Sequence, residues 1–84
     1  MQIELYGMAR RRAQTERIEV EAANLTQALR ALAAACPALE PEVVDGGHLT
    51  DAYLASLNGE FVTDGETPLR ADDTLLIVAA QAGG

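Results

Sequence analysis

Alternation of apolar and polar residues is the first pattern along the chain. Every second residue is apolar in residues 2–6 and again in residues 16–21. This period of two is typical of a strand that buries one face. Residues 7–15 break the alternation, so we expect a loop there and a β-hairpin formed by the two flanking strands.

A helix is predicted next. Asn24 is placed as its N-cap, and Gln27 stands where the partner in a capping box belongs. Apolar residues then recur at spacings of three and four through residues 25–36, which gives one apolar stripe. Pro37 removes a helix donor and disfavours helical geometry at the residue before it, so the helix should end there.

The second half of the chain is rich in turn signals. Residues 38–51 lack strong periodicity and are predicted to be a loop, with room for one helical turn. Residues 53–57 are predicted to be a strand, and Asn58-Gly59 is typical of a type I′ hairpin turn because both positions require a positive φ. Residues 61–62 then form the return strand, and residues 74–80 form an apolar last strand.

The predicted order is ββαβββ, which indicates an α+β fold with one main helix packed on one face of a mixed sheet. The last strand is apolar on both faces and suits a central position. In that strand Leu75 and Ile77 should face the helix. Leu76 and Val78 should then point to the open face.

The length and the net charge of the chain restrict the classes of function that it can have. The chain has 84 residues and is expected to be one domain, with little room for a deep catalytic pocket. Its net charge is −7 and it contains no lysine. An acidic surface argues against nucleic-acid binding and favours a protein partner with a basic face. The absence of lysine excludes a Schiff-base lysine and excludes isopeptide bonds to the chain's own side chains.

We expect the protein to carry no targeting signal. We expect no signal peptide, because residues 2–6 go straight into a strand pattern. No apolar run approaches the roughly 20 residues of a membrane span. Cys36 is the single cysteine, so no intramolecular disulfide is expected. These features predict a cytoplasmic protein.

The candidate reactive group is the carboxylate of Gly84. The chain ends in Gln81, Ala82, Gly83 and Gly84, a tail with no bulky side chain. Residues without a Cβ atom adopt backbone angles that others avoid, so such a tail can thread a narrow channel in another protein. A carboxylate is a poor electrophile, and activation as an acyl-adenylate followed by attack of sulfur would leave a thiocarboxylate.

The whole chain resembles the MoaD/ThiS family of ubiquitin-like sulfur carriers. The matching segments, in order, are Leu5-Tyr6-Gly7, Leu57-Asn58-Gly59-Glu60-Phe61-Val62, Thr67-Pro68-Leu69-Arg70-Ala71-Asp72-Asp73-Thr74-Leu75 and Gly83-Gly84. The length and the late Asn-Gly hairpin look more like MoaD, the small subunit of molybdopterin synthase. The resemblance implies a β-grasp (ubiquitin-like) domain over residues 1–80 and a flexible tail over residues 81–84.

The resemblance also implies partners. An E1-like adenylating enzyme of the MoeB/ThiF type would use ATP to activate Gly84, and the molybdopterin synthase large subunit (MoaE type) would accept the sulfur. The chain itself would bind no cofactor and would be a carrier, a non-catalytic subunit, rather than an enzyme. Phe61 and Val78 match apolar positions that face partners in the family, and Leu76 is a partner-binding candidate because it lies on the same open face as Val78. The competing interpretation is that loops or the tail cover these residues.

Several alternatives stay open. MoaD-like tails often carry Pro-Pro where this chain has Ala79-Ala80, and related carriers serve thiamine synthesis, cysteine synthesis or tRNA thiolation. A ubiquitin-like protein modifier would use the same tail, and a β-grasp interaction module with an inert tail is a third hypothesis.

Four further features have competing interpretations. The run of Arg10, Arg11 and Arg12 is either a contact for phosphate or an acidic partner, or a solvated loop, which we favour. We interpret Cys36 as a small core residue rather than a redox nucleophile, and His48 as an exposed polar residue without metal-ligand company. Asp72-Asp73 is better explained as a turn before the last strand than as paired catalytic carboxylates.

Overall fold

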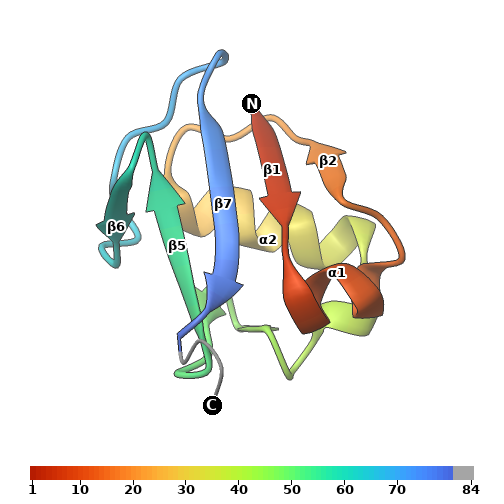
Figure 1. Ribbon diagram of the computed structural model, residues 1–84. Helices are drawn as coiled ribbons and strands as arrows, with labels where there is room; N and C mark the ends of the chain where they lie inside the picture. Colours follow the sequence, from red (N-terminus) through yellow and green to blue (C-terminus); the bar gives the residue numbers. More distant parts are fainter. Residues whose placement is uncertain (81–84) are drawn as a thin grey trace.

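A computed structural model describes residues 1–80, and it contains a five-stranded sheet with one long helix across one face (Figure 1). The predictions for Gln81, Ala82, Gly83 and Gly84 lie outside the described residues. The elements are β1 (Gln2–Leu5), α1 (Gly7–Ala13), β2 (Arg17–Glu19), α2 (Leu25–Ala35), the 3-10 helix η1 (Pro37–Leu39), β3 (Val44–Asp45), β4 (His48–Leu49), β5 (Tyr53–Leu57), β6 (Glu60–Val62) and β7 (Thr74–Ala79).

The five-stranded sheet has the order β2-β1-β7-β5-β6, so β7 is its central strand, as its apolar composition predicts. β7 pairs in parallel with β1 and antiparallel with β5. The two outer pairs, β1 with β2 and β5 with β6, are antiparallel. The sheet is therefore mixed, and the predicted α+β class is confirmed.

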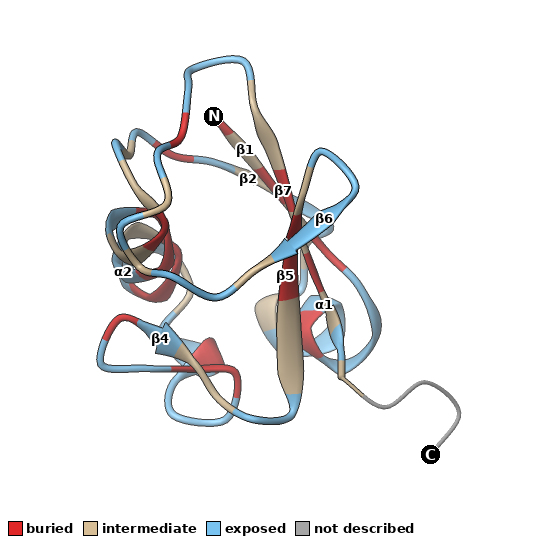
Figure 2. Ribbon diagram, turned by 90° about the vertical axis from the view of Figure 1, so that its left-hand side faces the viewer, coloured by how far each residue is buried: buried red, intermediate tan, exposed pale blue. Residues whose placement is uncertain are grey.

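The core lies between the sheet and α2, where the buried residues gather (Figure 2). Leu75 and Ile77 are 0% exposed, which confirms that they face the helix. α2 begins as predicted, because the side chain of Asn24 accepts a hydrogen bond from the Gln27 amide at 2.9 Å. It ends at Ala35, immediately before Cys36 and Pro37.

The prediction of a loop over residues 7–15 is wrong, because residues 7–13 form α1. Ala9 is fully buried and Ala13 packs against the core one turn later, so tertiary packing holds a helix whose own sequence carries little apolar signal. Gln14 closes the helix in a left-handed conformation with φ of 59°. The strands β1 and β2 pair antiparallel as expected, but a helix joins them instead of a hairpin loop.

Residues 38–51 are also more ordered than a loop. They contain part of η1 and a second, two-stranded sheet of β3 and β4, joined through Gly46 and Gly47 at positive φ. The turn lies against α2, since a Cβ atom on Gly47 would be 2.9 Å from Nε of Arg30. Only glycine fits both this close approach and the φ of 83°.

The predicted hairpin between β5 and β6 is confirmed. Asn58 and Gly59 have φ values of 53° and 88°, the two positive values that a type I′ turn requires. The turn fixes the register in which Ser56 faces Phe61. This register decides which side chains share the open face of the sheet.

Candidate functional site

β7 ends at Ala79, directly before Ala80 and the predicted tail of residues 81–84. The Ala80 amide donates a hydrogen bond to the Ala52 carbonyl oxygen at 2.8 Å, so the chain is tied to the sheet up to this residue. A shallow recess adjoins this end of the strand and is lined by Met8, Asp51, Ala52, Tyr53, Ala79 and Ala80. The described part of the candidate site is therefore the end of β7 and the segments around it.

The open face of the sheet, opposite α2, brings together the three residues predicted to bind partners. Ser56 is paired with Phe61 on one side and with Leu76 on the other, so these residues form one row across β6, β5 and β7. Val78 is paired with Leu54 in the next row on the same face. We call Leu54, Phe61, Leu76 and Val78 the apolar half of the open face.

Exposure differs among these residues. Phe61 is 65% exposed on the edge strand β6, so none of the described residues covers it. Leu76 and Val78 are partly buried by their neighbours in the centre of the sheet. An exposed aromatic ring beside half-buried aliphatic side chains has the composition of a docking surface. Their role in partner binding stays a prediction.

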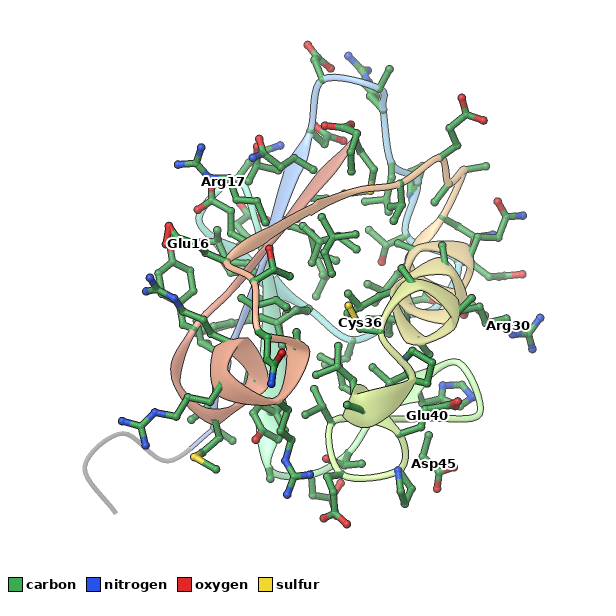
Figure 3. The ribbon with its side chains drawn as sticks, turned by 90° about the vertical axis from the view of Figure 1, so that its right-hand side faces the viewer. Glu16, Arg17, Arg30, Cys36, Glu40 and Asp45 are labelled. Carbon is green, nitrogen blue, oxygen red and sulfur yellow. The ribbon has the colours of Figure 1, made fainter. Side chains whose placement is uncertain are left out.

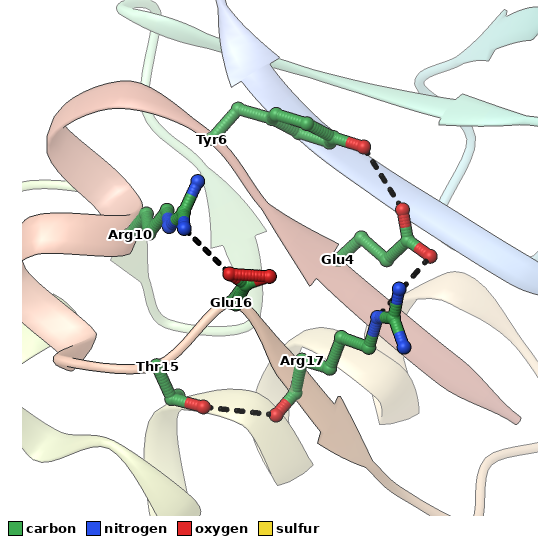
Figure 4. Close-up of polar contacts among 6 residues, drawn as sticks. All are labelled: Glu4, Tyr6, Arg10, Thr15, Glu16 and Arg17. Carbon is green, nitrogen blue, oxygen red and sulfur yellow. Dashed lines mark hydrogen bonds and ion pairs between the residues drawn. The ribbon is translucent and has the colours of Figure 1, made fainter.

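The other half of the open face is charged (Figure 4). The Tyr6 hydroxyl donates to Glu4 Oε1 at 2.9 Å, and Arg17 Nε lies 3.8 Å from Glu4 Oε2. Beside them, Arg10 pairs with Glu16. The hydrogen bond to Glu4 and the negative charge of that carboxylate raise the pKa of Tyr6 above its ordinary value. We call these five residues the charged half of the open face.

Sequence reasoning predicted Phe61, Leu76 and Val78 of the apolar half but missed the charged half. The pairing of β1 with β2 was expected, but Arg10 lies near Glu16 only because residues 7–13 form α1. The spacing of four between Ala9 and Ala13 was the only signal of that helix in the sequence.

The other residues that the sequence singled out are Cys36, His48, Asp72 and Asp73, and the contacts assign none of them a catalytic role. Cys36 is partly buried against the core, and this burial raises the pKa of its thiol, which lowers its thiolate fraction. Asp73 accepts a hydrogen bond from the Arg70 amide at 2.7 Å in the turn before β7, as the turn interpretation predicts. His48 is exposed on β4. Within residues 1–80, no three His, Cys, Asp or Glu side chains form a group that could hold a metal ion.

The five-stranded mixed sheet, with its central β7 and with α2 packed across one face, defines a β-grasp protein of the ubiquitin-like class. The family model of the ThiS family matches residues 3–84. The chain therefore belongs to the ThiS family of ubiquitin-like sulfur carriers. No curated protein matches the sequence significantly.

Solved structures agree with this assignment. The chain is 30% identical to SAMP1 from Haloferax volcanii, with a TM-score of 0.85 over 99% of this chain and 97% of that one. CysO in the BexX/CysO complex of Amycolatopsis orientalis is 20% identical, with a TM-score of 0.82 and coverage of 99% and 98%. In the complex of subunits 1 and 2 of the molybdopterin-converting factor from Helicobacter pylori, the match is 19% identical, with a TM-score of 0.67 and coverage of 99% and 96%. The last two likenesses show the fold alone.

No helix within residues 1–80 is long and apolar enough to cross a membrane.

Proposed function

We propose that this chain carries sulfur on the carboxyl group of Gly84. The observation that carries the proposal is the family match, which runs to residue 84 and so includes Gly83 and Gly84. An E1-like adenylating enzyme of the MoeB/ThiF type joins the carboxylate to the α-phosphate of ATP and releases pyrophosphate. Hydrosulfide then attacks the acyl carbon and expels AMP, which leaves a thiocarboxylate.

The carrier supplies a positioned reactive group, while its partners supply the catalytic groups. Gln81, Ala82 and Gly83 have no bulky side chains, which suits a tail that enters a narrow channel. The apolar half of the open face docks the domain, with Phe61 as its exposed aromatic anchor. Docking fixes the distance that the tail must span, so binding and chemistry are separable by substitution.

The intact mass of the protein tests this proposal. The chain is incubated with an adenylating enzyme from the same genome, ATP and sulfide, and a mass gain equal to the exchange of one oxygen for sulfur is expected. A chain that lacks Gly84 is the control and should gain no mass. The Gly84→Ala variant should keep its fold and gain mass more slowly, because its added methyl group must pass the channel. The absence of any gain with each ThiF-type enzyme of the genome would refute the carrier function.

The acceptor that we propose first is a MoaE-type large subunit of molybdopterin synthase. The fold likeness to the molybdopterin-converting factor of Helicobacter pylori supports this choice, and the likeness to CysO keeps a cysteine-pathway acceptor as an alternative. Carriers for thiamine synthesis and tRNA thiolation remain further alternatives. Incubation of the thiocarboxylated chain with each candidate acceptor, followed by mass measurement of the carrier, identifies the one that removes the sulfur.

Protein modification is the second candidate function. The neighbour from Haloferax volcanii, 30% identical, is described as small archaeal modifier protein 1. In this alternative Gly84 becomes joined to lysine side chains of other proteins. Conjugates that appear in a cell extract with the wild-type chain, and are absent with the chain lacking Gly84, would favour it over the carrier function.

A further inference from the structure

Positive charge is concentrated in one short segment of an acidic protein. Four of the six arginines lie in residues 7–17, together with only one of the thirteen acidic residues. The segment covers α1 and the start of β2. The rest of the chain is therefore more acidic than the net charge of −7 implies.

Arg11 and Arg12 are the two uncompensated charges of this segment. Ala9 and Ala13 define the buried side of α1, and at about 100° per residue Arg11 points almost directly away from that side. Arg12 lies on its flank, and both side chains are exposed. Within residues 1–80, Arg10 is paired with Glu16, but no carboxylate lies within ion-pair distance of Arg11 or Arg12.

The helix lies beside the end of β7. The Tyr6 amide, one residue before α1, donates to the Ile77 carbonyl oxygen at 3.2 Å. Met8 on α1 lines the same recess as Ala79 and Ala80. Figure 1 shows α1 next to the end of β7, so a protein that receives residues 81–84 passes close to the basic helix.

We propose that Arg11 and Arg12 contact carboxylate groups on the protein that receives the C-terminal tail. The identity of that protein as an adenylating enzyme rests on the proposed function. The contact also orients the complex, because an acidic rim on the partner is attracted to α1 and repelled by the acidic remainder of the chain. Two free guanidinium groups on a protein of net charge −7 suit a small carboxylate cluster better than a nucleic acid, whose binding requires many phosphate contacts.

Charge reversal at matched positions tests the contact. The Arg11→Glu/Arg12→Glu variant is compared with Arg30→Glu/Arg70→Glu, which has the same net charge. Arg30 is exposed on the far side of the molecule from Glu16 and Arg17 (Figure 3), and Arg70 lies in the turn before β7, at the opposite end of that strand from α1. A third variant, Arg11→Lys/Arg12→Lys, keeps the charge. Circular dichroism checks that all three are folded.

Association with a ThiF-type enzyme is measured by biolayer interferometry at low and high salt, separately from tail charging. The α1 reversal should weaken binding about tenfold or more at low salt, and this loss should shrink at high salt because exposed charges are screened. The far-side reversal should have a much smaller effect, and the lysine variant should bind within about twofold of the wild type, since an exposed charge pair depends mainly on charge.

Equal affinities of the two reversal variants would overturn the proposal. A short single-stranded RNA serves as the polyanion probe. The proposal would also be overturned if the wild type bound this RNA and the α1 reversal abolished RNA binding but left enzyme binding unchanged. A mass gain at Gly84 with equal affinities would refute only the arginine contact. A selective loss of binding without any mass gain would refute the sulfur chemistry and support the contact.

Discussion

Leu75 and Leu76 are neighbours on β7 that face opposite sides of the sheet. Leu75 is 0% exposed and packs in the core against α2, whereas Leu76 lies on the open face between Ser56 and Glu4. The same substitution at each position, Leu75→Ala and Leu76→Ala, therefore removes the same atoms from two different environments. The first should reduce stability, and the second should mainly reduce partner binding.

The structure sets the size of the difference. Truncation of a fully buried leucine to alanine costs about 2–5 kcal/mol. A domain of 84 residues has a free energy of unfolding of only about 4–13 kcal/mol at the usual value per residue. At about 4–8 °C per kcal/mol, Leu75→Ala should lower the Tm by at least about 8 °C. Leu76 is only partly buried and leaves no enclosed cavity, so Leu76→Ala should cost about 1 kcal/mol or less.

The Kd for a partner protein should change more in Leu76→Ala than in Leu75→Ala. Leu76 lies in the same row as Phe61, so its loss removes apolar contact from the centre of the docking face. An interface side chain of this kind is worth about 1–2 kcal/mol, or about a tenfold rise in Kd. The Tm is measured by circular dichroism, and the Kd with an adenylating enzyme by biolayer interferometry at a temperature where both variants are folded. The reasoning fails if Leu76→Ala lowers the Tm as much as Leu75→Ala, or if Leu76→Ala and Phe61→Ala both leave the Kd unchanged.

Three further predictions concern single contacts. Asn24→Ala removes the side-chain bond to the Gln27 amide and should destabilise the fold by about 1 kcal/mol in urea denaturation, whereas Asn24→Ser should restore most of it. Glu4→Gln should lower the raised pKa of Tyr6 toward its ordinary value, because the variant loses the carboxylate charge that opposes the phenolate; NMR titration measures this pKa. In the wild type, the stability that this pair contributes falls as the pH rises above the ordinary pKa of tyrosine. Cys36 should react with iodoacetamide more slowly than an exposed cysteine peptide at the same pH, since burial raises its pKa, and equal rates would contradict that burial.

The parts of the fold that the sequence predicted depend on local signals. Asn24 caps α2 through an amide three residues away, and Asn58-Gly59 forms its turn from its own backbone preferences. The apolar character of both faces of β7 indicated its central place without knowledge of any partner strand. Each of these signals lies within a few residues of the structure that it specifies.

The parts that were missed depend on distant contacts. α1 has seven residues, too few for a stable isolated helix, and its fully buried residue is an alanine. The small sheet of β3 and β4 closes against α2 at Gly47, next to Arg30, seventeen residues earlier in the chain. Apart from the spacing of Ala9 and Ala13, no local pattern in the sequence indicates either contact.

The candidate site also has a part that the sequence predicted and a part that it did not predict. Alternation along the last strand placed Leu76 and Val78 on one face, and the family resemblance named Phe61. The register shows that all three share this face. The charged half depends also on α1, the element that the sequence did not predict, because this helix brings Arg10 near Glu16. The tail residues 81–84 were assigned from their composition and from the family resemblance, and their role stays a prediction.

The parallel pairing of β1 with β7 links the β1–β2 connection to the tail. Because the two strands are parallel, the C-terminal ends of β1 and β7 lie next to each other at the same end of the sheet. Any segment inserted after β1 is therefore beside the place where residues 81–84 begin. In α1 the inward residue Ala9 serves the core, while the outward residues Arg11 and Arg12 are free to vary without cost to packing. If Arg11 and Arg12 contact the partner as proposed, substitutions on the outer face of α1 change partner recognition and leave the core intact.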